Sequence, residues 1–439
     1  MRMESFRKAL GRRLRFVIAA AALFLLLAPA SRDAAGSSCA SEAFWITDPV
    51  LPAGVGGGGA GADCLFHSYA WKSFLYLMSR DGQAGNALKY ERYRLAGRES
   101  CPRASCSAFT GVERADSGNG LFIRSTKQQA PAAGGRLFSA KAPGSGNPHG
   151  VSICGMSKDP TQQADGKHLY DQKGKAVLYE IRFSQSMCSM LNGSGPLHPF
   201  PENTIEMKLS WRQISTAERS RYYWRTQKTA SGAELLLGLV GVHIARIESW
   251  HKELIWSTFE HRDNVPDCVR PRREKGWSFT SEPCAACLRE STAGECEAKG
   301  KCHRLNTGFI SRGELTLDGV KPADICRLAP HGGGSADNIR AIRDLNESVR
   351  NRLDRLPNGN AMAVWKNYFL VGTVWLPHRF ESKGPSPRRP AGSRALANAT
   401  MESFQQARKN GCFSCHARRA KSGPEGISHI LPHPKGNRF

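Results

Sequence analysis

The sequence lacks the short patterns that mark the common hydrolases and nucleotide-binding proteins. It has no Gly-x-Ser-x-Gly, no His-Glu-x-x-His and no P-loop, and no internal repeat or nucleic-acid-binding motif is evident. Acidic residues are scarce, with 38 Asp and Glu against 62 Lys and Arg, for a formal net charge of +24. The missing motifs argue against hydrolysis and nucleic-acid binding. The positive surface either favours an acidic partner or an anionic membrane surface, or has no specific partner.

Long apolar runs are also missing, apart from a short one near the N-terminus. Met1–Arg15 carries six Lys or Arg and one acidic residue, Phe16–Ala28 is apolar, and Ala28-Pro29-Ala30 offers small residues for cleavage. About twenty apolar residues are needed to cross a bilayer, so we predict a signal peptide, with an uncleaved anchor as the alternative. We expect a periplasmic or otherwise exported protein with no membrane span after cleavage and a net charge of 24 − 5 = +19.

Cysteine, in contrast, is plentiful, with fourteen residues. Two of them belong to Cys412-Phe413-Ser414-Cys415-His416, the Cys-x-x-Cys-His attachment signature of c-type haem. In such a motif both thiols bond to one haem, and the His binds its iron. A redox-active disulfide and half of a zinc site are the alternatives. The sequence therefore predicts one covalent haem c per chain, with Cys412, Cys415 and His416 as its binding residues.

The remaining twelve cysteines are an even number, which suits up to six disulfides in an oxidising compartment. They are Cys39, Cys64, Cys101, Cys106, Cys154, Cys188, Cys268, Cys284, Cys287, Cys296, Cys302 and Cys326. Sequence does not give the connectivity. A zinc site is the alternative for the four cysteines between 284 and 302.

Composition divides the chain into five segments. They are a signal peptide (1–30), a flexible Gly- and Ala-rich leader (31–62), a core domain (63–380) with a Cys-rich insertion at about 268–330, a Pro- and Arg-rich tether (381–395) and a haem-binding segment (396–439). We predict an α+β fold with a β-rich core, a few helices and disulfide-stapled loops, followed by a small helical C-terminal haem-binding segment.

Hydrophobic periodicity places the main elements of the core. Helices are predicted from Asp63 to Leu77, from Ile339 to Leu353, and over the short stretch Met401–Lys409. Long loops pinned by disulfides are predicted between Cys101 and His168. Alternating or continuous apolar residues predict strands over Val177–Phe183, Ile205–Arg212, Leu235–Ile247, Leu254–His261 and Val364–Trp375.

The third and fourth of these strands are predicted to pair across a six-residue loop, Glu248–Glu253. In that register His243 faces Thr258, because the two strands are antiparallel. Side chains alternate between the faces of a strand, so one face carries His243, Trp256, Thr258 and Glu260.

Four stretches taken together resemble a known bacterial family. They are Phe66–Leu75, Gly238–Ile244, Trp256–Pro266 and Leu396–Phe404. The family is usually described as "cytochrome c family protein", and its members look like exported proteins with a β-rich core and one C-terminal Cys-x-x-Cys-His. The resemblance runs from about Asp63 to His416 and implies a haem, but no particular reaction. The basic, Cys-rich stretch from Cys284 to Cys326 departs from it.

We expect the protein to transfer electrons through the covalent haem to a redox partner protein. A partner with an acidic surface would suit the positive charge of the chain. The alternative is a haem-dependent oxidoreductase or a gas or redox sensor, in which the core domain binds a small substrate. Whether the protein is an enzyme stays open, although the pattern favours an electron-transfer protein.

The sixth ligand of the iron is the least determined part of the predicted site. Residues 417–439 contain no Met, so a Met downstream of the motif is excluded. We predict His429 or His243 as the distal ligand, with His433, His261 and Met401 as further candidates. An iron without a sixth ligand is the remaining alternative. A bis-His iron should have a lower potential than a His/Met iron.

Overall fold

The computed structural model describes residues 39, 48–51, 60–82, 87–95, 151–153, 156–158, 168–187, 200–228, 234–249, 251–269, 271, 276–307, 322–376, 390–407 and 411–416. The predicted signal peptide, most of the leader, most of the predicted loops between Cys101 and His168, and His429 and His433 lie outside them. Within the described ranges, none of the helices combines the length and the apolar character needed to cross a membrane.

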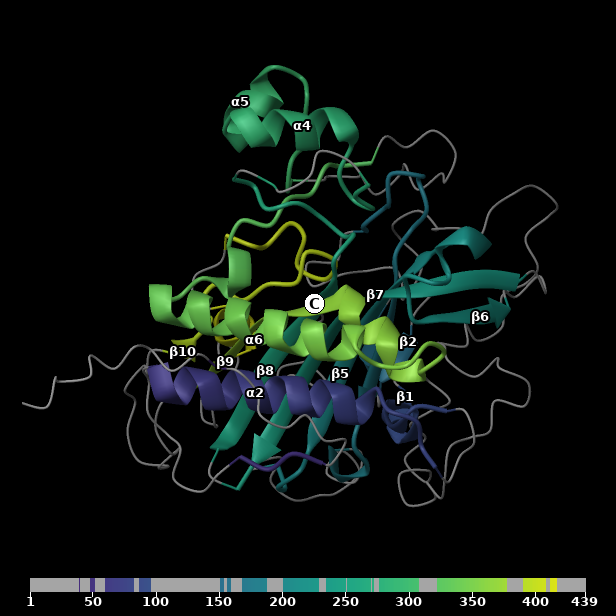
Figure 1. Cartoon of the computed structure of the whole chain (residues 1–439), viewed down its shortest axis with the longest axis vertical. Helices are drawn as coiled ribbons and strands as arrows, with labels where there is room; N and C mark the ends of the chain where they lie inside the picture. Colours follow the sequence, from purple (N-terminus) through teal and green to yellow (C-terminus); the bar gives the residue numbers. More distant parts are fainter. Residues whose placement is uncertain are drawn as a thin grey trace, which may run out of the picture. The chain divides into compact units, whose positions relative to one another are not determined.

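One antiparallel sheet organises the core (Figure 1). Its strand order is β1-β4-β5-β7-β8-β9-β10, and β6 pairs with the first residues of β7. The strands are β1 (Arg94–Leu95), β4 (Leu178–Phe183), β5 (Ile205–Gln213), β6 (Trp224–Lys228), β7 (Glu234–Glu248), β8 (His251–His261), β9 (Tyr368–Trp375) and β10 (Ala391–Gly392). A separate hairpin consists of β2 (Val151–Ile153) and β3 (Met156–Lys158). The predicted β-rich α+β class is confirmed.

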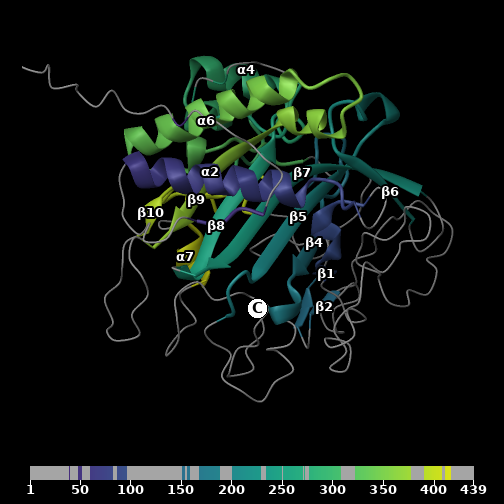
Figure 2. The same ribbon diagram turned by 60° about the horizontal axis from the view of Figure 1, so that its bottom comes forward.

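Two long helices, α2 (Ala60–Leu77) and α6 (Ala336–Asp354), lie side by side across one face of this sheet (Figures 1 and 2). We call this face the helix side. Phe74 of α2 stacks on Phe259 of β8 with ring centroids 4.2 Å apart, and Trp71 meets the same ring edge-on. Burial of these large rings supplies much of the hydrophobic stabilisation of the core. Both helices were predicted from their apolar spacing, and both are confirmed.

Polar contacts also join the two helices. His67 Nε2 lies 2.8 Å from Asn338 Oδ1, and Trp71 Nε1 donates to Asn346 Oδ1 at 2.9 Å. Burial lowers the pKa of His67 to about 4, so its ring is neutral at neutral pH. His67 and Trp71 are therefore packing residues of the helix side.

The central hairpin has the predicted register but a shorter loop. His243 pairs with Thr258, as predicted. β7 continues to Glu248 and β8 begins at His251, so the predicted six-residue loop is wrong. The register shifts between Arg246 and Glu248, and this irregularity accommodates the tighter connection.

The chain after β9 differs from the prediction in two places. Residues 391–392, inside the predicted tether 381–395, form β10, which pairs with β9. The predicted helix Met401–Lys409 is wrong over its described part, because residues 399–407 form turns and bends. Asn398 and Ser403 bond the local backbone there, and such bonds compete with helix formation.

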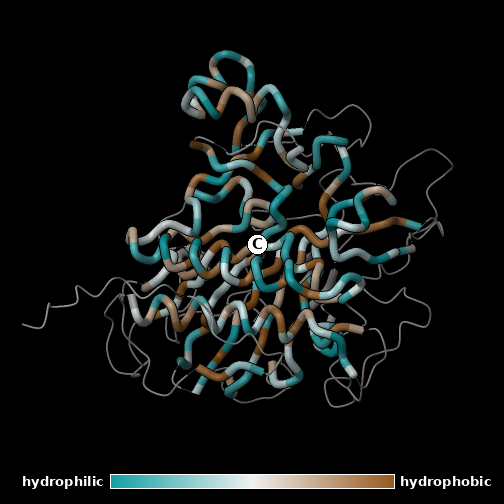
Figure 3. Tube along the Cα trace, viewed as in Figure 1, coloured by the Kyte–Doolittle hydropathy of each residue, from teal (hydrophilic) through white to brown (hydrophobic). Residues whose placement is uncertain are grey.

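The Cys-rich insertion contains α4 (Glu282–Glu290) and α5 (Ala293–Ala298), and it is largely hydrophilic (Figure 3). Its four cysteines form the disulfides Cys284–Cys302 and Cys287–Cys296, so the zinc alternative is wrong. Small segments with little apolar core commonly depend on such bonds. Cys268–Cys326 and Cys39–Cys64 are also disulfides, whereas Cys101, Cys106, Cys154 and Cys188 lie outside the described residues.

The remaining helical elements are short. They are the 3-10 helices η1 (Lys89–Arg92), η2 (Thr216–Glu218), η3 (Pro330–Gly332) and η4 (Ala361–Asn367), and the α-helix α7 (Gly411–His416). η4 occupies the first part of the predicted strand Val364–Trp375, so β9 begins later than predicted, at Tyr368.

Candidate functional site

Residues 396–407, which we call the strap, lie on the face of the sheet opposite to α2 and α6. We call this face the strap side. Thr400 Oγ1 lies 2.6 Å from Ser210 Oγ of β5, and the Tyr179 hydroxyl of β4 donates to the Thr400 carbonyl at 2.6 Å. A Cβ atom on Gly241 of β7 would lie 2.6 Å from both hydroxyl oxygens. Gly241 therefore allows the strap to approach the backbone of the sheet closely.

Asn398 connects the strap to the central strand β8. Its side-chain amide donates to Thr258 Oγ1 at 2.9 Å and to the Phe259 carbonyl at 3.0 Å. Its Oδ1 accepts from the Thr400 N–H at 2.9 Å. All these groups are buried, so each bond satisfies a polar atom that water cannot reach.

His243 of β7 meets Glu402 of the strap. The ring Nε2 lies 2.9 Å from Glu402 Oε2, and the Asn398 N–H donates to the same oxygen at 2.8 Å. Burial alone raises the pKa of the Glu402 carboxyl, but His243 and these hydrogen bonds outweigh it and lower the pKa to about 2. A carboxylate only accepts hydrogen bonds, so Nε2 of His243 is the donor, and Nδ1 is the nitrogen that a neutral imidazole would leave for a metal.

Glu260 of β8 ties the strap to the Cys-rich insertion. Its Oε1 accepts from the Ala399 N–H at 2.8 Å, and its Oε2 pairs with Arg327 Nη2 at 2.6 Å. The other arm of Arg327 reaches Asp267 at 2.8 Å. Thus His243, Thr258 and Glu260, predicted to share one face, all contact the strap.

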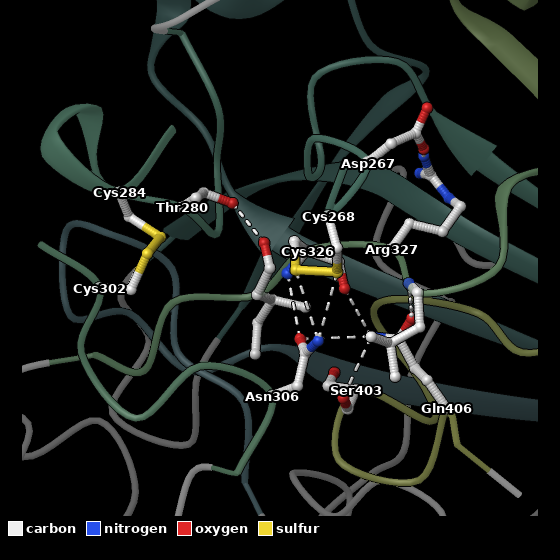
Figure 4. The surroundings of a disulfide bond; sticks show 12 residues. Asp267, Cys268, Thr280, Cys284, Cys302, Asn306, Cys326, Arg327, Ser403 and Gln406 are labelled. Carbon is white, nitrogen blue, oxygen red and sulfur yellow. Dashed lines mark hydrogen bonds and ion pairs between the residues drawn. A yellow bond between two sulfur atoms is a disulfide. The ribbon is translucent and has the colours of Figure 1, made fainter. Parts of the chain in front are cut away.

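The Cys268–Cys326 disulfide forms the next anchor of the strap (Figure 4). Asn306 Nδ2 lies 3.5 Å from the Cys326 sulfur, and the Cys326 N–H donates to Asn306 Oδ1 at 3.0 Å. Gln406 of the strap donates to the Cys326 carbonyl at 3.0 Å. The disulfide-bonded insertion therefore holds the end of the strap that leads to the Cys-x-x-Cys-His motif.

α7 contains that motif and rests on an apolar part of the strap side. Phe413 is buried, Cys412 packs at the edge of the same cluster, and Figure 2 shows α7 below β8 and β9, away from α2. The cluster consists of Phe183, Met187, Phe200, Ala245, Ile247, Leu254, Trp256, Val371, Val374, Leu376, Leu396 and Phe413. It is contributed mainly by strands that are far apart in sequence.

His416 lies against Trp256 of β8. The two ring centroids are 4.1 Å apart, and the ring planes meet at 47°. Trp256 is only 6% exposed, yet its indole Nε1 has no hydrogen-bond partner among the described residues. The predicted motif and the predicted strap-side residue Trp256 are therefore brought together.

A haem is a flat, largely apolar group with two carboxylates. Beside the motif lie a buried apolar cluster and a buried N–H without an acceptor among the described residues, and both suit such a group. Trp256 was singled out from the sequence for its face of the sheet, but nothing local indicated its contact with His416. Asn398 and Glu402 were missed as site residues, because their partners lie more than a hundred residues away.

Two of the further candidates for the sixth ligand are engaged elsewhere. His261 Nε2 lies 2.9 Å from the Arg221 carbonyl, and Nδ1 accepts from the Asp263 N–H at 3.1 Å, so both ring nitrogens are used. Burial lowers the pKa of His261 to about 4. Met401 is buried in a different cluster from the one that contains Phe413. His261 and Met401 are therefore poor candidates.

Among the residues that the structure describes, no group of three or more His, Cys, Asp or Glu side chains is arranged to hold a metal ion. Comparison of the chain with protein-family models, with curated proteins and with solved structures gives no match.

Proposed function

We propose that this chain is an exported mono-haem c-type cytochrome that transfers electrons. Cys412 and Cys415 would hold the haem, and His416 would bind the iron. The Cys-x-x-Cys-His sequence on α7 carries the proposal. The apolar surface beneath α7, the disulfides and the resemblance of four stretches to the bacterial cytochrome c family support it.

When bound, the haem supplies one-electron chemistry at its iron. The chain supplies the surroundings: Phe413 and the apolar cluster exclude water, Trp256 holds the His416 ring, and the strap fixes the start of α7. An acidic redox partner in the periplasm, or in another exported location, would suit the positive charge of the chain.

Covalent haem attachment is the first prediction to test. The pyridine adduct of the reduced protein should show one haem per chain, attached through two thioether bonds. Replacing both thiols, Cys412→Ala with Cys415→Ala, should abolish haem staining on a denaturing gel. The control replaces the Cys287–Cys296 pair by Ala, which should weaken the fold but leave the stain. Persistence of the stain without Cys412 and Cys415 would contradict the proposal.

For the sixth ligand we propose His429 or His243. His243 is favoured by its contact with Glu402, because histidine ligands commonly donate their second ring N–H to a carboxylate. His243→Ala or His429→Ala should convert a low-spin ferric spectrum to a high-spin one. If both variants remain low-spin with the potential of the wild type, both assignments are wrong.

A haem-dependent oxidoreductase, or a gas or redox sensor, is the second candidate. The His243–Glu402 pair favours it, because an imidazole bonded to a carboxylate can move a proton for a small substrate bound by the core. Carbon monoxide separates the two candidates. A reduced spectrum that does not change with the gas supports electron transfer, and rapid binding supports catalysis or sensing.

A further inference from the structure

Trp256 is a buried hydrogen-bond donor without an acceptor. Its Nε1 has no partner among the described residues, whereas the buried indoles Trp71 and Trp211 donate to Asn346 and Glu180. Leaving a buried donor unpaired costs about 1–3 kcal/mol. Such a group in a native structure needs an explanation, and a bound water, ion or ligand is one.

The surroundings of Trp256 restrict what that molecule is. Its ring lies 4.1 Å from the ring of His416, and it belongs to the apolar cluster that contacts Cys412 and Phe413. An acceptor carried by an otherwise apolar group would fit this position. It would also lie beside the histidine of the Cys-x-x-Cys-His motif.

We propose that the indole N–H of Trp256 donates to a propionate carboxylate of the haem bound through Cys412 and Cys415. This inference rests on the proposed function. The propionates are the strong hydrogen-bond acceptors on the haem periphery, since the ring nitrogens bind iron and the other substituents are hydrocarbon or thioether. A hydrogen bond to a carboxylate is about twice as strong as one between neutral groups. Trp256 would thus be a positioning residue, because it contacts His416 and would bond to the haem bound by Cys412 and Cys415.

This bond should change the midpoint potential of the haem iron. The N–H donor reduces the negative charge on a carboxylate near the iron. Negative charge near the iron favours the ferric state. Removing the donor should therefore lower the midpoint potential. Loss of ring packing alone would loosen the His416 ring and alter the low-spin spectrum.

The test compares two Trp→Phe variants of the holoprotein. Trp256→Phe keeps an aromatic ring against His416 but removes the N–H donor. Trp375→Phe is the matched control, because Trp375 is buried against Phe66 on the helix side, with centroids 4.0 Å apart. We expect a lower midpoint potential with an unchanged low-spin spectrum for Trp256→Phe, and the wild-type potential for Trp375→Phe. An unchanged potential in Trp256→Phe overturns the inference.

Ultraviolet resonance Raman spectroscopy provides a second readout. The difference between wild type and Trp256→Phe isolates the indole band that reports hydrogen bonding at Nε1. This band should have its bonded position in the holoprotein and its unbonded position when Cys412→Ala and Cys415→Ala remove the haem. The same position in both proteins overturns the inference but leaves the proposed function intact. A wild-type protein without covalent haem overturns both.

Discussion

The two faces of the sheet are covered in different ways. On the helix side, α2 and α6 bury aromatic and aliphatic side chains such as Phe74 and Leu345. On the strap side, a segment of turns is held by polar side chains, with Asn398 and Glu402 bonding to β8 and β7. The helix side is maintained by buried apolar area, and such packing tolerates hydrophobic substitutions that keep the volume of the core. The strap side also buries apolar side chains such as Met401 and Phe413, but its turns depend on individual hydrogen bonds. We therefore expect its amides to exchange more readily than those of α2.

The largest expected effect is on the helix side. Phe74→Ala removes a fully buried ring that contacts Phe259, Trp71 and Trp365, and should lower the free energy of unfolding by about 3–5 kcal/mol. Denaturant unfolding at neutral pH measures this. Leu65→Ala on the same helix is the control, because Leu65 is 42% exposed and its loss should change stability by less than about 0.5 kcal/mol. Equal costs for the two would show that α2 is not a core element.

A smaller and more local effect is expected on the strap side. Asn398→Ala leaves the carbonyl of Phe259 and the N–H of Thr400 without their side-chain partner, which should cost about 1–3 kcal/mol. Amide hydrogen exchange should increase in the strap more than in α2. Asn351→Ala, at an exposed position of α6, provides a control with the same change in chemistry. Equal acceleration in α2 and the strap would contradict the separation of the two faces.

The two faces should also lose stability in different pH ranges. The pKa of His67 is about 4 in the folded protein against an ordinary value of 6.5, so its contribution is lost as the pH falls from about 6.5 to 4. The pKa of Glu402 is about 2 against 4.5, so its contribution is lost only between about 4.5 and 2. Acidification should therefore affect the helix side first. Each group changes the slope of the free energy of unfolding against pH by at most about 1.4 kcal/mol per pH unit.

Two conservative variants separate these contributions. His67→Gln keeps a donor for Asn338 but does not titrate, so it should flatten the pH dependence of unfolding between about 6.5 and 4. Glu402→Gln should change the slope only below about pH 4.5. A change at pH 6 in Glu402→Gln, or none in His67→Gln, would show that other groups dominate that range.

Sequence periodicity was sufficient to predict the helices and strands of the helix side, because buried residues recur at regular intervals along each of them. Phe66, Phe74 and Leu77 share one face of α2, and the alternation in β5 shows which of its residues face that helix. The hairpin pairing of His243 with Thr258 followed in the same way. The loop length was missed because the irregularity beside Arg246 has no signature in hydrophobicity.

The strap could not be predicted, because its conformation is set by residues far away in sequence. Asn398 bonds to Thr258, and Glu402 meets a ring on β7, at separations of 140 and 159 residues. Asn410-Gly411, a pair typical of helix ends, suggested a helix from Met401, but the described residues form turns, and these turns bury Met401. The Cys-x-x-Cys-His motif was recognised because its chemistry is local. The candidates for the sixth ligand lie away from the motif in sequence, so the sequence did not choose among them.

The position of the strap in the chain also bears on how the sheet is completed. β4, β5, β7 and β8, which the strap covers, all precede it in the chain. Until residues 396–407 dock, Glu260 and Thr258 lack their partners from the strap, and the surface beneath α7 is uncovered. Docking of the strap and of the segment that carries Cys412 and Cys415 therefore completes a sheet whose central strands lie earlier in the chain.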